Sequence, residues 1–234
     1  METILINEAK KINIELTDKM IEKFFVYKNL LKEWNEKINL TAIIDDYDII
    51  MKHFIDSLTI EKYIKKGAKV IDVGTGAGFP GIPLKIIRED IDVVLLDSLN
   101  KRVNFLNEVI KTCELEKIVA IHGRAEDIAR QEKYREKFDI ATARAVANIA
   151  TLSEYCCPFV NIGGSFICMK ADATDEIENA AKAIRTFGMN IQQIDKIEIE
   201  EINAKRTIII YKKEKNTPKT YPRKAGIPSK NPIL

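Results

Sequence analysis

Residues 70–81 constrain the fold more than any other segment of this chain, because an apolar run ends in an acid and then enters a glycine-rich turn. The segment reads Val-Ile-Asp-Val-Gly-Thr-Gly-Ala-Gly-Phe-Pro-Gly. Gly74, Gly76 and Gly78 allow backbone dihedral angles that other residues avoid, and they let a ligand approach the main chain. The pattern predicts a strand, a ligand-binding turn and a helix, with Asp72 just before the turn. It is typical of nucleotide-cofactor sites.

The chain after residue 66 alternates between short β-rich runs and amphipathic helices. This alternation predicts an α/β fold, in which a parallel sheet carries helices on both faces. The last two β-rich runs are separated by too few residues for a helical crossover, so they are expected to pair as an antiparallel hairpin. We expect strands near 69–73, 92–97, 117–122, 138–143, 164–170, 190–200 and 205–212, and helices near 81–89, 100–113, 125–131, 148–157 and 173–187.

The two ends of the chain differ from this region. Residues 1–66 carry apolar side chains at helical spacing, for example between Ile21 and Ile38, and predict a helical extension. From Tyr211 onward there are seven Lys and Arg residues against one acid, together with four of the seven prolines. This composition predicts an extended basic tail. The expected organisation is a helical extension at 1–66, an α/β domain at 67–213 and a basic tail at 214–234.

Composition narrows the classes of protein that this chain can belong to. No segment approaches the roughly 20 apolar residues of a membrane helix, and the first residues lack the layout of a signal peptide. The four cysteines have no Cys-x-x-Cys spacing, and the two histidines do not form a ligand pattern with them. We therefore expect a cytoplasmic protein with reduced, buried thiols, without a metal and without a membrane partner. A monomer is the expected oligomeric state, although these observations do not bear on it.

The glycine turn by itself is compatible with two classes of cofactor. Gly76-Ala-Gly78-Phe-Pro-Gly81 fits the fingerprint of dinucleotide-binding sheets, and Asp97 follows about 20 residues later, near the position of the ribose-binding acid. An NAD-dependent oxidoreductase is therefore one alternative. Asp97 is expected at the carboxyl end of the second strand, where it can accept hydrogen bonds from ribose hydroxyls or cap the helix that follows.

The order Asp72-x-Gly74-x-Gly76-x-Gly78 resembles motif I of class I S-adenosylmethionine-dependent methyltransferases. That family has a Rossmann-like, seven-stranded and mostly parallel sheet, whose last strand enters antiparallel. The closing hairpin predicted here agrees with this arrangement. The resemblance implies S-adenosylmethionine as the cofactor, with Asp72, Gly74, Gly76 and Asp97 around it.

Five further blocks of sequence carry a closer resemblance. They are Trp34-Asn-Glu-Lys-Ile-Asn-Leu-Thr41, His53-Phe-Ile-Asp-Ser-Leu58, Gly74–Gly81, Ala143-Arg-Ala-Val-Ala147 and Pro222-Arg-Lys-x-Gly-x-Pro228. In this order, from about residue 25 to the C-terminus, they resemble the guanine-N7 methyltransferases of small-subunit ribosomal RNA, also called the glucose-inhibited division protein B family.

This resemblance implies a reaction and a partner. The reaction is methyl transfer from S-adenosylmethionine to N7 of a guanine, position 527 in the 530 loop of 16S ribosomal RNA. The expected partner is 16S ribosomal RNA or the small ribosomal subunit. A catalytically silent RNA-binding protein on a cofactor-binding fold remains an alternative, because a binding pocket does not demonstrate turnover.

The cofactor-binding positions of the family fall on five residues here: Gly74, Phe79, Ala125, Glu126 and Arg144. Phe79 is expected to pack against the cofactor, and residues 125–126 to lie beside the adenine. For Glu126 the alternative is a solvated position in the first turn of a helix.

Guanine N7 has a lone pair and no proton, so its methylation needs no general base. The protein is then expected to contribute proximity and alignment, a term of about 7 to 11 kcal/mol at best. Arg144 and Lys170 are the residues expected beside the reacting groups, where they position the cofactor carboxylate or RNA phosphates. The family usually reads Met-Lys-Gly after the fifth strand, whereas this chain has Ala171 after Lys170. His53 and Asp56, one helical turn apart, are expected to form a local structural hydrogen bond.

Arg124, Arg223 and Lys224 are the expected RNA contacts, since phosphate contacts supply affinity and register. Removal of the tail after Tyr221 is accordingly expected to weaken RNA binding and to spare cofactor binding.

Overall fold

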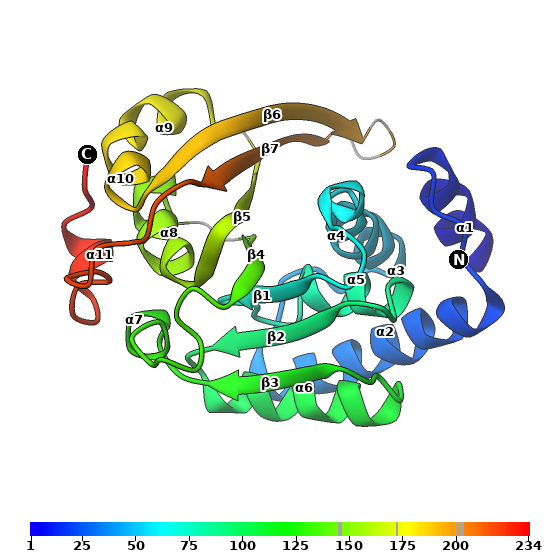
Figure 1. Cartoon of the computed structure of the whole chain (residues 1–234). Helices are drawn as coiled ribbons and strands as arrows, with labels where there is room; N and C mark the ends of the chain where they lie inside the picture. The colour runs from blue at the N-terminus through cyan, green and yellow to red at the C-terminus, as the bar shows by residue number, and fades with distance from the viewer. Residues whose placement is uncertain (145–146, 172, 200, 202–203) are drawn as a thin grey trace.

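A seven-stranded sheet with the order β3-β2-β1-β4-β5-β7-β6 forms the centre of the molecule (Figure 1). The computed structural model describes residues 1–144, 147–171, 173–199, 201 and 204–234. Five strands run parallel: β1 (Lys69–Val73), β2 (Asp92–Asp97), β3 (Ile118–His122), β4 (Phe138–Ala143) and β5 (Val160–Lys170). β7 (Ala204–Lys213) pairs antiparallel with both β5 and β6 (Met189–Ile199). The predicted fold class and closing hairpin are confirmed.

Helices cover both faces of the sheet. One face carries α2 (Asp18–Ile38), α4 (Asp56–Leu58), α5 (Gly81–Ile87) and α6 (Asn100–Thr112), and the other carries α8 (Ile149–Cys156), α9 (Thr174–Asn179) and α10 (Ala181–Thr186). The shorter elements are α1 (Glu2–Lys11), α3 (Asp46–Asp48), the π-helix Ile49–Ile55, the 3-10 turns Glu61–Tyr63 and Cys157–Phe159, α7 (Ala125–Ile128) and α11 (Ile227–Lys230).

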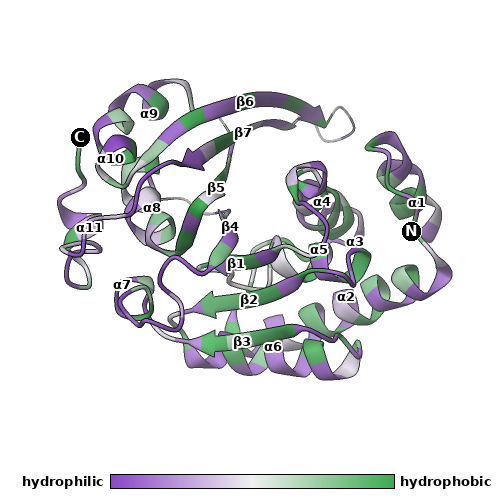
Figure 2. Cartoon of the chain, in the orientation of Figure 1, coloured by the Kyte–Doolittle hydropathy of each residue, from purple (hydrophilic) through white to green (hydrophobic). Residues whose placement is uncertain are grey.

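Two apolar clusters fill the space between the sheet and its helices. Side chains alternate between them along β7: Ile208 and Ile210 belong to the first cluster, and Ile209 and Tyr211 to the second. This alternation follows from the two-residue period of a strand that is covered on both faces. The first cluster also contains Leu5, Phe24 and Leu31, so the N-terminal helices share their core with the sheet. Figure 2 shows the green central strands and the mostly purple outer strand β6.

Several element boundaries differ from the sequence prediction. β5 begins at Val160 rather than near residue 164, because Val160 pairs with Phe138 and the register shifts before Ile140. The expected helix at 125–131 ends at Ile128. The expected helix at 173–187 is two short helices that meet at Ala180.

The basic tail is folded onto the body of the protein. It is mostly non-helical, as predicted, but it contains the short helix α11. Pro222 and Pro228 are buried, and Arg135 donates hydrogen bonds to the carbonyl groups of Thr217 (2.8 Å) and Tyr221 (2.9 Å).

Other features of the described residues bear on the class of protein. All four cysteines are free and buried, as expected. Within the described part of the chain, no helix has the length and hydropathy of a membrane span. Nor do the described side chains bring three His, Cys, Asp or Glu residues into a metal-binding arrangement.

Candidate active site

The glycine turn joins β1 to α5, and its three glycines have different surroundings. All three have positive φ angles: 70° at Gly74, 62° at Gly76 and 100° at Gly78. A Cβ atom built on Gly74 or Gly76 would have no heavy atom within 4 Å, whereas on Gly78 it would lie 2.5 Å from Ile82 Cδ1. The first two glycines therefore leave room for a ligand beside the main chain, and the third packs against α5. From α2, the buried Tyr27 hydroxyl donates to the carbonyl group of Ala77.

Asp72 lies beneath this turn and is fully buried. Its Oδ2 atom accepts hydrogen bonds from Thr75 Oγ1 (2.6 Å) and from the Gly81 amide (2.9 Å). Its Oδ1 atom has no hydrogen-bond partner among the described residues. Asp72 thus braces the turn from below, and its direct contact with a cofactor stays a prediction.

The burial of Asp72 leads to a testable pH dependence of stability. Burial raises the pKa of this carboxyl group from 3.8 to about 6, although the hydrogen bonds from Thr75 and Gly81 oppose the shift. The folded state therefore binds the proton more tightly than the unfolded chain does. The resulting stabilisation is complete below pH 3.8 and is lost as the pH rises through 6.

Asp72→Asn removes this titration. Between pH 4 and pH 7, we expect the unfolding free energy of the native protein to fall by roughly 2 kcal/mol relative to that of the variant, at about 1.4 kcal/mol per pKa unit. Urea unfolding of both proteins at pH 4, 5.5 and 7 measures this difference. A difference that stays constant with pH would show that Asp72 has an ordinary pKa.

Asp97 joins the end of β2 to the glycine turn. Its buried carboxylate accepts hydrogen bonds from the amides of Gly76 and Leu99, both at 2.9 Å. The Leu99 amide lies just before α6, so Asp97 holds the loop in front of the helix and does not cap the first helical turn. This position, at the carboxyl end of a parallel strand, agrees with the predicted ribose contact.

A cavity of about 440 Å³, here called the glycine-turn cavity, opens at the carboxyl ends of the strands. Its walls come from the loops after β1, β2 and β3, from α8 and from the C-terminal tail. The lining residues are Val73, Gly74, Leu96, Asp97, Ser98, Leu99, Gly123, Arg124, Ala125, Glu126, Ala147, Leu152, Tyr155, Gly226 and Ser229. Gly74, Asp97, Ala125 and Glu126 of the predicted cofactor-binding set are thus brought together.

A second cavity of about 530 Å³, here called the Arg144 cavity, lies nearby. It is lined by Ile43, Lys52, His53, Asp56, Arg144, Met169, Lys170, Ala171, Glu176 and Arg206. The ammonium group of Lys170 donates to the carbonyl group of Ala147 (3.0 Å), which lines the glycine-turn cavity. The two cavities are therefore neighbours on either side of this contact.

Arg144 is held by four groups. Its Nη1 atom donates to the Lys52 carbonyl group and to Asp56 Oδ2, both at 2.9 Å, and Nη2 donates to His53 Nδ1 at 3.0 Å. The guanidinium carbon lies 4.9 Å from the centre of the Phe79 ring. This arrangement uses the planar, forked shape of the arginine head group.

Asp56 is 1% exposed and joins two arginines, because its Oδ1 atom also accepts from Nε of Arg206 (2.7 Å). The expected local hydrogen bond between His53 and Asp56 is replaced by an arrangement in which each binds Arg144.

His53 is a neutral imidazole. An arginine only donates hydrogen bonds, so His53 Nδ1 accepts from Arg144, and Nε2 carries the proton that it donates to Thr41 Oγ1 (2.9 Å). Burial and the adjacent Arg144 charge lower the pKa of His53 to about 3. The imidazole stacks on Phe79 with the ring centres 4.3 Å apart. Phe79 is buried below His53 and outside the lining of both cavities, so its cofactor contact stays a prediction.

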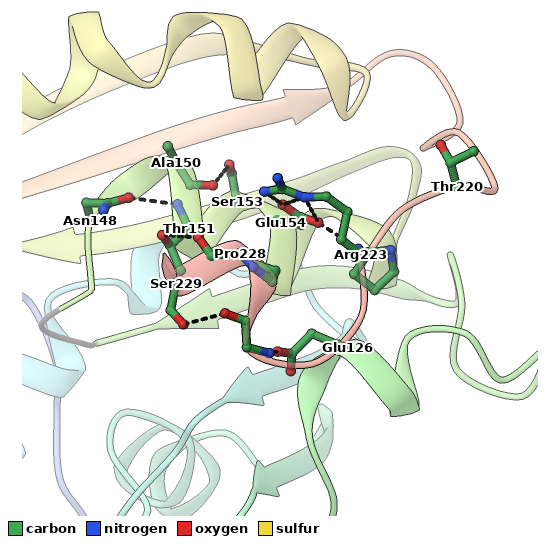
Figure 3. A network of polar contacts seen from close by, with 12 residues as sticks. Glu126, Asn148, Ala150, Thr151, Ser153, Glu154, Thr220, Arg223, Pro228 and Ser229 are labelled. Carbon is green, nitrogen blue, oxygen red and sulfur yellow. Dashed lines mark hydrogen bonds and ion pairs between the residues drawn. The ribbon is translucent and has the colours of Figure 1, made fainter. Parts of the chain in front are cut away.

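The remaining predicted residues are one buried lysine of the catalytic pair and three basic residues expected to contact RNA. Lys170 is buried and forms an ion pair with Glu176 (3.0 Å). Its position beside the Arg144 cavity is therefore kept, although Ala171 follows it where the family usually has glycine. Arg124 and Lys224 are exposed, and their contact with RNA stays a prediction. In contrast, the Arg223 guanidinium forms an ion pair with Glu154 (Figure 3).

Glu126 is not the solvated residue that was considered as an alternative. It is buried, and its Oε1 atom accepts a hydrogen bond from the Gly226 amide (3.0 Å). Tyr155, Gly226 and Ser229 also line the glycine-turn cavity, but the sequence did not predict them as residues of the cofactor site. The Pro-Arg-Lys-x-Gly-x-Pro block pointed to Gly226, but its basic composition led to an RNA-binding interpretation.

The architecture and the site define a class of protein. The open backbone at Gly74 and Gly76, and the buried carboxylate of Asp97 at the end of β2, fit the methionine and ribose groups of S-adenosylmethionine. Together with the antiparallel β7, they define a class I S-adenosylmethionine-dependent methyltransferase.

Comparison with solved structures supports this fold. TYW2 from M. jannaschii, solved in complex with AdoMet, matches with a TM-score of 0.58 and 14% identity, over 74% of this chain and 79% of that chain. Trm5b from Pyrococcus abyssi matches with a TM-score of 0.53 and 17% identity, over 75% of this chain and 52% of that chain.

Comparison of sequences identifies the family. The family model "GidB: rRNA small subunit methyltransferase G" matches residues 20–209. A "Ribosomal RNA small subunit methyltransferase G" from Clostridium botulinum (strain Alaska E43 / Type E3) is 54% identical over 233 residues, 98% of each chain. The protein of the same name from Acetivibrio thermocellus is 52% identical over 234 residues, all of this chain and 97% of that protein. The chain therefore belongs to the ribosomal RNA small subunit methyltransferase G family, as the sequence predicted.

Proposed function

We propose that this protein transfers a methyl group from S-adenosylmethionine to N7 of one guanine in the 530 loop of 16S ribosomal RNA. The glycine-turn cavity would hold the adenosyl part of the cofactor, and the Arg144 cavity would receive the guanine. Family membership supports the methyltransferase reaction and decides against the dinucleotide alternative. We further propose that the protein acts as a monomer in the cytoplasm, where its ribosomal substrate is found.

The observation that favours N7 is that the side chains around the Arg144 cavity that could act as a general base are all engaged in hydrogen bonds or ion pairs. His53 has both ring nitrogens in hydrogen bonds and a pKa of about 3. Asp56 lies between two arginines, and Glu176 pairs with Lys170. An exocyclic amine or a ring carbon must lose a proton when it is methylated, whereas N7 loses none. Because His53, Asp56 and Glu176 are engaged with other groups, a nucleophile that needs no proton acceptor, such as N7, is favoured.

The residues of the site would promote the reaction by positioning the cofactor and the RNA substrate. When bound, S-adenosylmethionine supplies a methyl group on a positively charged sulfur. Asp97 would orient the ribose, and the backbone at Gly74 would admit the amino-acid part of the cofactor. Arg144 lines the Arg144 cavity, and Lys170 lies at the boundary of the two cavities, so their charges could hold the cofactor carboxylate or an RNA phosphate.

Basic side chains around the cavities support an RNA substrate. Lys52 and Arg206 border the Arg144 cavity, and the exposed Arg124 and Lys224 lie on the glycine-turn side of the molecule. Phosphate contacts of this kind supply affinity, while a pocket selects the unstacked base.

The test is transfer of labelled methyl from S-adenosylmethionine to small ribosomal subunits that lack the modification, followed by mapping of 7-methylguanine. We expect incorporation at a single guanine of the 530 loop. Labelled methyl on an exocyclic nitrogen or on a carbon would overturn the N7 assignment. Cofactor binding without any incorporation would favour a catalytically silent RNA-binding protein.

A further inference from the structure

We propose that the C-terminal strap, defined as residues 217–230, is the outer wall of the cofactor site, and that Arg223 and Glu126 are positioning residues for cofactor binding. The inference deepens the proposed function, since it rests on the cofactor occupying the glycine-turn cavity. Gly226 and Ser229 of the strap line this cavity together with the loops after β2 and β3. Removal of the strap would open the cavity to solvent on that side.

The first anchor of the strap is Arg223 on Glu154 of α8 (Figure 3). The Glu154 carboxylate is 1% exposed and accepts from the Arg223 backbone amide (2.7 Å), from Nε (3.0 and 3.1 Å) and from Nη2 (2.6 Å). A buried carboxylate with one bidentate guanidinium partner is costly to leave unpaired, so this contact specifies where the strap crosses α8.

The second anchor connects the strap directly to the cavity wall. The Gly226 amide donates to Glu126 of α7, and the φ angle of 81° at Gly226 orients it there. Ser229 Oγ donates to the Gly226 carbonyl group (3.1 Å), and Thr151 Oγ1 donates to that of Pro228 (3.1 Å). These bonds close a short loop over α7 and α8 (Figure 3).

The third anchor lies at the start of the strap. Arg135 donates to the carbonyl groups of Thr217 and Tyr221, and Arg130 to those of Thr220 and Pro222. The strap is therefore held on both sides of Arg223, and its path is determined by the body of the protein.

These contacts change the role expected of the tail. The segment at Ala125 and Glu126 is where the cofactor adenine is expected, and the carboxylate of Glu126 is bonded to the strap. Displacement of the strap removes a wall of the cavity and frees Glu126 at the same time. Cofactor affinity should therefore depend on the tail, contrary to the sequence-based expectation that tail removal spares it.

The experiment measures the Kd of S-adenosylhomocysteine by calorimetry for the full-length protein and its variants. The double variant Glu154→Gln/Arg223→Gln removes the ion pair without leaving a buried charge alone. We expect its Kd to rise at least tenfold, with KM for S-adenosylmethionine rising in parallel and kcat at saturating cofactor changing less than twofold. Lys219→Ala, an exposed change on the strap itself, is the matched control and should keep the native Kd.

A second variant tests the inference independently if the double variant does not fold. Gly226→Ala keeps the ion pair of Arg223 with Glu154, and its Cβ atom meets no heavy atom within 4 Å, but alanine disfavours the positive φ angle that aims the amide at Glu126. Thermal melting without ligand checks that each variant is folded at the temperature of the titration. Unchanged Kd values in both folded variants, or a loss of RNA affinity alone, would overturn the inference. Failure of the native protein to bind S-adenosylhomocysteine would instead overturn the proposed function.

Discussion

Replacement of Arg144 by lysine is expected to lower kcat/KM for methyl transfer at least a hundredfold. A lysine ammonium cannot bind the Lys52 carbonyl group, Asp56 and His53 together, nor can it stack on Phe79 as a guanidinium does. Hydrogen bonds that involve a charged group stabilise the native structure by about 1.5 to 3 kcal/mol each, so the loss of two leaves the side chain without a fixed position. A misplacement of reacting groups by about 1 Å can lower the rate roughly a hundredfold.

The measurement is steady-state methyl transfer to small ribosomal subunits, with cofactor affinity determined in parallel. Arg185→Lys makes the same chemical change at an exposed position on α10 and serves as the control. Full cofactor affinity together with full turnover in Arg144→Lys would show that Arg144 has no positioning role in the reaction.

Replacement of Gly78 by alanine is expected to abolish cofactor binding and to lower the unfolding free energy by about 2 to 6 kcal/mol. The φ angle of 100° at Gly78 is unfavourable for any residue with a Cβ atom, which costs about 1 to 3 kcal/mol. The new methyl group would also lie 2.5 Å from Ile82 Cδ1 and 3.0 Å from the Tyr27 hydroxyl. Overpacking of this kind adds about 1 to 3 kcal/mol.

Gly67→Ala separates these two contributions. Gly67 has a φ angle of 70°, but a Cβ atom there would meet no heavy atom within 4 Å. The control should therefore lose only the strain energy and should bind S-adenosylhomocysteine normally. Denaturant unfolding and calorimetry measure the two effects. Equal losses in both variants would mean that the contact with Ile82 and Tyr27 contributes nothing to the shape of the turn.

The fold followed from patterns that are local in the sequence. The alternation of β-rich runs and amphipathic helices, the glycines after Asp72 and the short spacing of the last two strands each depend on neighbouring residues. Backbone geometry and side-chain periodicity act over the same range. The boundaries were less predictable: β5 begins at Val160 because it pairs with Phe138, a residue of another strand.

The candidate site was predicted in part. Gly74, Asp97, Ala125 and Glu126 follow strand ends, and parallel strands bring such positions to one edge of the sheet, so their proximity could be expected. The sequence could not show that Arg144 would be held by His53 and Asp56, since the partners are about 90 residues apart and meet through packing of the N-terminal helices.

The sequence by itself determined the fold class with its antiparallel last strand, the family and, through the resemblance to that family, the class of cofactor, because these depend on local motifs and on blocks of residues that follow the same order as in the family. Only the tertiary structure decided where the C-terminal tail lies and which groups it contacts. Its basic composition indicated RNA, but the partner of Arg223 is a carboxylate 69 residues away, and that of the Gly226 amide is 100 residues away. Pairing of this kind depends on which buried groups the completed fold leaves in need of a partner, and no local pattern contains that information.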